Sequence, residues 1–163
     1  DGHSLNAMDE EQRAILRGKL VGFVFQSFQL LPSLTALENV MLPIELKGDS
    51  AANEKAKNLL VRVGLEERGH HYPNQLSGGE QQRVAIARAF ATEARILFAD
   101  EPTGNLDPQL SSEIMDLFRQ FCEVGVTVLI ATHDVDLISR MGLRLLRLEQ
   151  GKLIHDGVPG YAA

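Results

Sequence analysis

Residues 76–107 read LSGGEQQRVAIARAFATEARILFADEPTGNLD, and this stretch decides the fold. Ser77 and Glu80 have the S-x-x-E spacing of a capping box, which predicts the start of a helix. Such a start leaves backbone N–H groups and the positive end of the helix dipole for an anion. Gly78 and Gly79 would let a ligand approach the backbone closely. The stretch therefore predicts a helix N-terminus suited to phosphate.

A short apolar run within this stretch, residues 95–102 (RILFADEP), ends in two acids and a proline. A run that is apolar at successive positions is typical of a strand buried on both faces of a parallel sheet. In such sheets ligands bind beyond the carboxyl ends of the strands, where Asp100 and Glu101 would lie. Because side chains alternate at a strand end, one acid can hold Mg²⁺ while the other orients water.

The composition is that of a globular domain. The chain has 163 residues, of which 44% are hydrophobic and 23% charged, and its net charge is −6, which fits one domain with a real core. The negative charge argues against a broad nucleic-acid surface. The longest apolar run, residues 126–131, is too short to span a bilayer, and no secretory signal heads the chain. We therefore expect a soluble protein, with its one cysteine, Cys122, as a core thiol.

A second strand is predicted at residues 21–25 (VGFVF), and it places Gln26 at its carboxyl end. The amide oxygen of a glutamine can bind a metal ion or water while its NH₂ group donates to another acceptor. A further buried strand, residues 126–131, places His133 just past its end. Taken singly, either polar residue has a simpler interpretation, a solvated glutamine or a structural histidine.

Capping residues mark the helix boundaries. Asp9 is predicted to start a helix that ends near Gly18. Thr35 begins a second capping-box pattern, and Pro43 is expected to bound its helix. Asp107 is followed by proline, which predicts another helix start.

Five motifs, in this order, resemble those of the ATP-binding-cassette (ABC) ATPases, and the match covers nearly the whole chain. They are the Q-loop at residues 25–26 (FQ), the signature motif at 76–81 (LSGGEQ), the Walker B strand with its catalytic glutamate at 96–101 (ILFADE), the D-loop at 104–107 (GNLD) and the switch histidine region at 132–134 (THD).

The resemblance implies an α/β fold of the P-loop NTPase type, an ABC ATPase domain with a mainly parallel sheet flanked by helices. It assigns residues 1–26 and 92–163 to a RecA-like core and residues 27–91 to a helical subdomain that carries the signature helix.

The resemblance also implies a role for each matching residue in the hydrolysis of ATP with Mg²⁺. Asp100 would hold the metal ion, Glu101 would act as base or orient the attacking water, and Gln26 would bind both metal and water. His133 would contact the γ-phosphate. The remaining nucleotide-binding residues would be Ser77, Gly78, Gly79, Glu80 and Asp107.

In this family two ATPase subunits sandwich two nucleotides head to tail, so a homodimer is expected. Ser77, Gly78 and Gly79 would then bind the γ-phosphate of a nucleotide held by the other subunit. Asp107 keeps two compatible interpretations, a local helix cap and an acid that reaches across the dimer.

The family also implies a membrane-spanning permease as partner and a cytoplasmic protein, peripheral on the inner face of the cell membrane. The PTGNLD motif and residues 23–43 (FVFQSFQLLPSLTALENVMLP) resemble the lipoprotein-release, macrolide-exporter and cell-division ATPases. The function expected is to drive a membrane partner in export, lipoprotein release or mechanotransmission. The alternative is a truncated, non-hydrolysing module that acts as a binding or structural partner.

No G-x-x-x-x-G-K-[ST] pattern, the phosphate-cradling Walker A loop, occurs in the sequence, because Gly18-Lys19 is followed by Leu20 and Gly151-Lys152 by Leu153. In the family this loop precedes the Q-loop. We therefore expect the chain to be inactive alone, either as a fragment or as a natural derivative.

Overall fold

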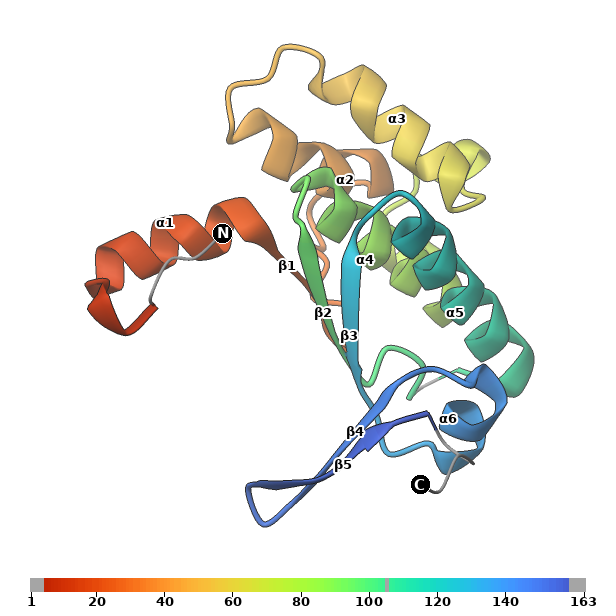
Figure 1. The fold of residues 1–163 in the computed structure, drawn as a ribbon. Coiled ribbons are helices and arrows are strands. Elements are labelled where there is room, and N and C mark those ends of the chain that lie inside the picture. Colours follow the sequence, from red (N-terminus) through yellow and green to blue (C-terminus); the bar gives the residue numbers. More distant parts are fainter. Residues whose placement is uncertain (1–4, 105, 159–163) are drawn as a thin grey trace. The chain divides into compact units, whose positions relative to one another are not determined.

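The computed structural model describes residues 5–104 and 106–158 (Figure 1). These residues form two compact units, one ending at Ala131 and one beginning at Thr132, and each is described by itself. The first contains, in chain order, η1 (Leu5–Ala7), α1 (Glu10–Leu20), β1 (Val21–Val24), α2 (Ala36–Glu45), α3 (Ala52–Arg62), η2 (Glu66–Arg68), η3 (Pro73–Gln75), α4 (Gly78–Ala91), β2 (Ile96–Asp100), α5 (Pro108–Glu123) and β3 (Thr127–Ala131). The second contains α6 (Val135–Met141), β4 (Leu145–Glu149) and β5 (Lys152–Gly157).

A three-stranded parallel sheet in the order β1-β2-β3 organises the first unit. Ala99 of β2 lies opposite Val24 of β1 on one side and Ile130 of β3 on the other. Strands that pair in parallel need long crossover connections. Along the chain, α2, α3 and α4 connect β1 to β2, and α5 connects β2 to β3 (Figure 1). The carboxyl ends of all three strands therefore meet at one edge of the sheet.

Helix α4 packs closely on β1. A Cβ atom at Gly22 would lie 3.0 Å from the carbonyl oxygen of Ala89, so a glycine is needed for the helix to come this near. Val24, Leu97 and Ala99 are buried on the same side of the sheet. The core therefore lies between this face and the helices that cover it.

The opposite face of the sheet differs from the prediction. Phe23, Phe98 and Leu129 lie in one row across the three strands, and they are 44%, 41% and 39% exposed. The expectation that residues 96–100 and 126–131 form strands buried on both faces is therefore wrong for the described residues. A parallel sheet normally has helices on both faces. The apolar pattern of the strands suits that arrangement, but here the helices bury one face.

The predicted helix starts are confirmed. The N-caps of α1, α2, α4 and α5 are Asp9, Thr35, Ser77 and Asp107. In α2 and α4 the cap side chain accepts a hydrogen bond from the N–H three residues on, and the glutamate at that position bonds back to the N–H of the cap. These bonds are local, and for this reason the residue spacing predicts them.

Three other predictions are wrong. Helix α1 does not end near Gly18 but runs to Leu20, because a glycine weakens a helix by only about 1 kcal/mol. Pro43 lies inside α2, where the burial of Ile44 offsets the backbone bond that a proline cannot donate. Cys122 is exposed; it shares a helix face with the buried Met115 and Phe118 but lies in the last turn of α5.

The second unit contains a hairpin, in which β4 pairs antiparallel with β5. Asp134 caps α6 by accepting from the N–H of Leu137. Among residues 5–104 and 106–158, no helix combines the length and the hydropathy that crossing a bilayer requires.

Asn39 holds the segment that leads from β1 to α2. Its fully buried side chain donates from Nδ2 to the carbonyls of Leu31 (3.1 Å), Leu34 (3.0 Å) and Thr35 (3.0 Å), and Oδ1 accepts from the N–H of Leu31 (2.9 Å). One amide therefore satisfies four backbone groups of a segment that has no regular structure of its own.

We expect Asn39→Ala to lower the free energy of unfolding by about 3 kcal/mol, because it leaves buried backbone groups without partners. Urea titration of the purified protein would measure the change. The matched control is Asn53→Ala, since Asn53 is exposed on α3 and its side chain bonds the sulfur of Met41, and its effect should stay within about 0.5 kcal/mol. Equal losses in the two variants would contradict the role of Asn39.

Candidate active site

The edge where β1 and β2 end carries the polar residues that the sequence singled out. Asp100 is the last residue of β2, and Gln26 follows the end of β1 by two residues. Ala99 is buried and Asp100 is exposed, as alternation along a strand requires. The carboxylate of Asp100 therefore lies on the exposed face of the sheet.

Glu101 leaves the strand in an uncommon backbone conformation. Its φ is +44°, in the left-handed region that residues other than glycine rarely enter. Two backbone bonds keep it there, since its N–H donates to the carbonyl of Ala131 (2.9 Å) and its carbonyl accepts from the N–H of Gly104 (3.1 Å). Strained residues held in this way cluster at functional sites, and the turn aims Glu101 differently from Asp100.

Gln26 and Glu101 both lie close to Gly104. A Cβ atom on Gly104 would lie 3.0 Å from Nε2 of Gln26 and 3.5 Å from Cβ of Glu101. The absence of a side chain at Gly104 therefore leaves room for the Gln26 amide beside the glutamate. The structure thus brings together two residues that lie far apart in the sequence.

The start of α4 is partly exposed, and Ser77 and Glu80 form the hydrogen bonds of its cap. Ser77 and Gly78 are exposed, whereas Gly79 is buried. The carboxylate of Glu80 accepts from the N–H of Ser77 (2.8 Å) and from Nε of Arg68 (2.9 Å). The Ser77 hydrogen bond, with a smaller contribution from Arg68, lowers the pKa of Glu80. Glu80 therefore stabilises the helix start.

Gly79 and Asp107 lie where the start of α4 packs against the start of α5. Asp107 caps α5 by accepting from the N–H groups of Gln109 (2.9 Å) and Leu110 (3.0 Å). A Cβ atom on Gly79 would lie 3.2 Å from the side chain of Leu110, so the two helix starts pack closely. The local-cap interpretation of Asp107 is confirmed, and its reach across a dimer stays a prediction. Asn105 of the predicted D-loop lies outside the described residues.

His133 belongs to the second unit, two residues beyond the end of β3, and its side chain is exposed. Its neighbours form a local turn in which the N–H of Asp134 donates to Oγ1 of Thr132 (3.1 Å). Its role toward a γ-phosphate stays a prediction.

The residues at the strand ends fit Mg²⁺ in the presence of a nucleotide. Mg²⁺ prefers oxygen ligands and takes one or two from a protein, the rest coming from phosphates and water. Asp100 supplies an exposed carboxylate, and Gln26 supplies an amide near Glu101. Among the described residues no group of three His, Cys, Asp or Glu side chains is placed to hold a metal by itself. The donor set therefore suits an ion that the nucleotide also ligates.

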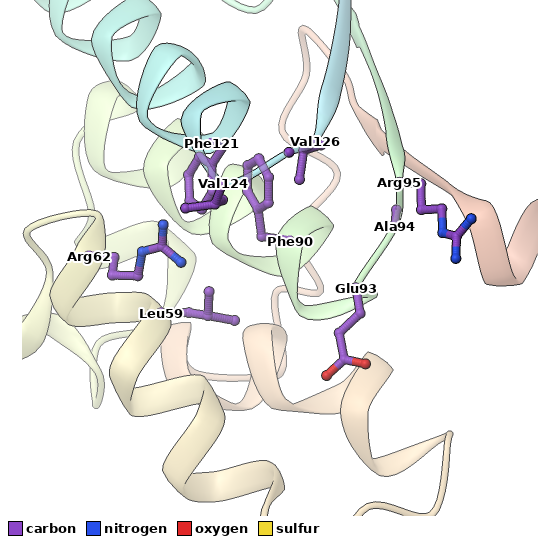
Figure 2. Close-up of a pocket in the computed structure, with 10 residues that line it drawn as sticks. Leu59, Arg62, Phe90, Glu93, Ala94, Arg95, Phe121, Val124 and Val126 are labelled. Carbon is purple, nitrogen blue, oxygen red and sulfur yellow. The ribbon is translucent and has the colours of Figure 1, made fainter.

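A separate cavity of about 320 Å³ lies at the other end of the strands, where Arg95 precedes β2 and Val126 precedes β3. Figure 2 shows Arg62 reaching from α3 toward the stacked rings of Phe90 and Phe121. The Arg62 guanidinium carbon lies 4.7 Å from the centre of the Phe121 ring. Ligands of parallel sheets bind at the carboxyl ends, so this cavity is not the candidate active site.

Sequence reasoning missed three residues that support the site: Asn39, Arg68 and Arg88. Arg68 and Arg88 act through bonds to residues 12 or more positions away, which no spacing rule relates. Asn39 bonds residues nearer in the chain, but in a segment without regular structure. Of the two arginines in the middle of α4, Arg83 pairs with Glu113, and Arg88 donates to backbone carbonyls.

Comparison with known proteins agrees with this geometry. The family model described as "ABC transporter" matches residues 1–104. The chain belongs to the ABC transporter family.

The relatives of this ABC domain include an uncharacterized ABC transporter ATP-binding protein, YbbA of Escherichia coli K12. It is 56% identical over 155 residues, which are 93% of this chain and 68% of YbbA. The macrolide export ATP-binding/permease protein MacB of Bdellovibrio bacteriovorus is 44% identical over 156 residues, 96% of this chain and 24% of MacB. Among solved structures, the dimeric ATP-binding cassette MJ0796 bound to ADP and Pi superimposes with a TM-score of 0.82 at 40% identity, over 97% of this chain and 71% of that one. The fold is that of an ABC ATPase cassette.

In this ABC domain we expect Glu80→Gln to keep the capping box, because glutamine also serves at that position, and to lose the ion pair with Arg68. The folded pKa of Glu80 lies below its unfolded value of about 4.3. Its contribution is therefore fully present above that pH and is lost as the pH falls toward the folded value.

The expected difference in unfolding free energy between wild type and Glu80→Gln is up to about 1 kcal/mol at pH 7, and it shrinks toward zero at a pH low enough to protonate Glu80 in the folded protein as well. Urea unfolding at both pH values would measure it. Glu67→Gln, at an exposed position of η2, is the control and should change little at either pH. A pH-independent difference for Glu80→Gln would refute the ion-pair contribution.

We also expect Gly104→Ala to displace the Gln26 side chain, because the new methyl group would crowd its Nε2 atom. The unfolding free energy should change by less than about 1 kcal/mol, since a flexible side chain can move aside. The side-chain amide resonances of Gln26 in a ¹⁵N–¹H spectrum would report the displacement. Gly18→Ala, with no atom near the added methyl group, should leave them in place.

Proposed function

We propose that this chain is the ATP-hydrolysing part of an ABC complex that drives a membrane-spanning partner. The observation that carries the proposal is the meeting of Gln26 and Glu101 over Gly104 at the carboxyl edge of the sheet. Membership of the ABC transporter family supports it.

Hydrolysis of a phosphoanhydride depends on placement and charge stabilisation. Glu101 accepts a proton from the attacking water. The oxygen of that water bonds to the γ-phosphorus as the bond to ADP breaks, and ADP departs. The amide of Gln26 orients that water, because it can donate and accept at once. Asp100, on the exposed face beside Glu101, is the residue that would hold Mg²⁺, and the ion when bound neutralises phosphate charge.

The exposed start of α4 supplies the second half of the proposed site. Ser77 and Gly78 are exposed at the positive end of the helix dipole, where an anion is stabilised. They would bind the γ-phosphate of a nucleotide held by a second subunit, and Asp107 would reach across the dimer. His133 would contact the γ-phosphate. The solved relative MJ0796 is a dimer with ADP and Pi bound, which supports this arrangement.

The proposed partner is a permease subunit at the inner face of the cell membrane. MacB, whose name includes a permease, shares this ABC domain, and the sequence resembles the lipoprotein-release and macrolide-exporter subfamily. We accordingly propose export, lipoprotein release or mechanotransmission as the work performed.

A non-hydrolysing ABC module is the second candidate. The observation in its favour is that no G-x-x-x-x-G-K-[ST] loop occurs in the 163 residues, and that loop is the main phosphate cradle of P-loop NTPases. The two candidates differ in one measurement, the rate of ATP hydrolysis by the full gene product reconstituted with its membrane partner.

In the full gene product we expect Glu101→Gln to lower kcat by about 10²–10⁴-fold, the usual contribution of a general base. Nucleotide should still bind, so the variant should accumulate as an ATP-bound dimer on a sizing column. Phosphate release and elution volume measure the two effects.

The matched control is Glu123→Gln, an exposed position on α5 that should keep wild-type kcat. Wild-type hydrolysis by Glu101→Gln would remove this glutamate from the catalytic role. Absence of hydrolysis in the wild type would favour the non-hydrolysing module.

A further inference from the structure

Two consecutive residues just after Gln26 have left-handed backbones. The φ angles of Phe28 and Gln29 are +57° and +48°. Such angles are rare for residues other than glycine, and for a bulky residue they mark a genuine outlier. The loop therefore has a conformation that its own residue types do not favour, and other contacts must hold it.

Arg88 provides those contacts. Its Nη1 donates to the carbonyl of Gln29 (2.6 Å) and its Nη2 to the carbonyl of Phe28 (3.1 Å), so one planar guanidinium spans both left-handed residues. The N–H of Gln29 bonds back to the carbonyl of Ser27 (2.6 Å) and tightens the same turn. Hydrogen bonds from a charged donor are about twice as strong as neutral ones.

The surroundings of Arg88 strengthen this hold. Its side chain is half-buried, and burial lowers its pKa because removal from water disfavours the charged form. The guanidinium still stays protonated at neutral pH. Within the described residues Arg88 joins no ion pair, so the two carbonyls are the acceptors that compensate its charge. A buried donor of this kind makes loss of the contact costly.

The contact joins two parts of the proposed active site. Arg88 lies on α4, the helix whose exposed start is proposed to bind phosphate, and the ring of Phe28 lies 3.8 Å from where a Cβ of Gly78 would be. Phe28 therefore touches α4 through its ring and through its carbonyl. Two residues before it, Gln26 lies over Gly104 beside Glu101.

We propose that Arg88 is a positioning residue, which fixes the left-handed Phe28–Gln29 turn to α4 and so keeps Gln26 beside Glu101. The expected effect of Arg88 on ATP turnover rests on the proposed ATPase function. The hold on the loop is a property of the folded chain and can be measured without nucleotide.

The test compares Arg88→Gln with wild type in the full gene product, first by hydrogen exchange without nucleotide. The amides of residues 26–30 should exchange about tenfold faster in the variant, since a charge-assisted bond is lost, while those of α5 stay unchanged. Arg83→Gln is the matched control on the same helix, because Arg83 bonds Val63 and Glu113 rather than this loop. Unchanged exchange at residues 26–30 in Arg88→Gln would overturn the proposal.

The second measurement is steady-state ATP hydrolysis. Arg88→Gln should lower kcat by about tenfold with KM within about twofold, because the residue positions a catalytic group rather than binding substrate. Faster exchange with an unchanged kcat would overturn the link to Gln26. A wild type that does not hydrolyse ATP would contradict the proposed function, and the exchange result would still decide whether Arg88 holds the loop.

A double variant separates positioning from general destabilisation. Gln29→Gly should recover part of the kcat lost in Arg88→Gln, because glycine adopts the left-handed region without penalty. Gln29→Gly should not recover stability lost in Arg83→Gln. Recovery of both, or of neither, would refute the role of the turn.

Discussion

The parallel pairing of β1 with β2 is the constraint on which the rest of the first unit depends. Because the strands run in the same direction, the loop after β1 and the turn after β2 emerge at one edge. Gln26 and Glu101 can meet only for this reason. The parallel pairing also requires a long connection between β1 and β2. Helix α4, whose start is part of the proposed site, belongs to that connection.

Helix α4 then ties these parts together. It approaches β1 at Gly22, where no side chain would fit. Its start packs on α5 through Gly79 and Leu110, and its last turns hold the carbonyls of Phe28 and Gln29 through Arg88. A shift of this helix would therefore displace its contacts with the sheet, with α5 and with the loop that carries Gln26.

The site shows strain where the proposed chemistry takes place. Glu101, Phe28 and Gln29 all have left-handed backbones, and each is held by hydrogen bonds to distant parts of the chain. Such conformations persist only where the surrounding structure fixes them. For the proposed ATPase function, they would place Glu101 and Gln26 at defined positions before nucleotide arrives, which would reduce the reorganisation needed for reaction.

The sequence by itself determined the local features. The four N-caps, the strands and the family motifs could be predicted, because capping bonds span three residues and strand patterns depend on neighbouring side chains. The apolar pattern of the strands, in contrast, was misleading about burial. Apolar residues such as Phe98 and Leu129 show that a sheet face is suited to being covered, but they do not show whether a helix covers it.

Only the tertiary structure decided which distant residues meet. The place of Gln26 over Gly104, the four bonds of Asn39 and the hold of Arg88 on the turn all join segments that no fixed spacing relates. Whether such groups come within 3 Å of one another depends on how helices pack on the sheet, to a fraction of an ångström. The residue types are present in the sequence, but the distances that give them a function arise only from the packing of the whole chain.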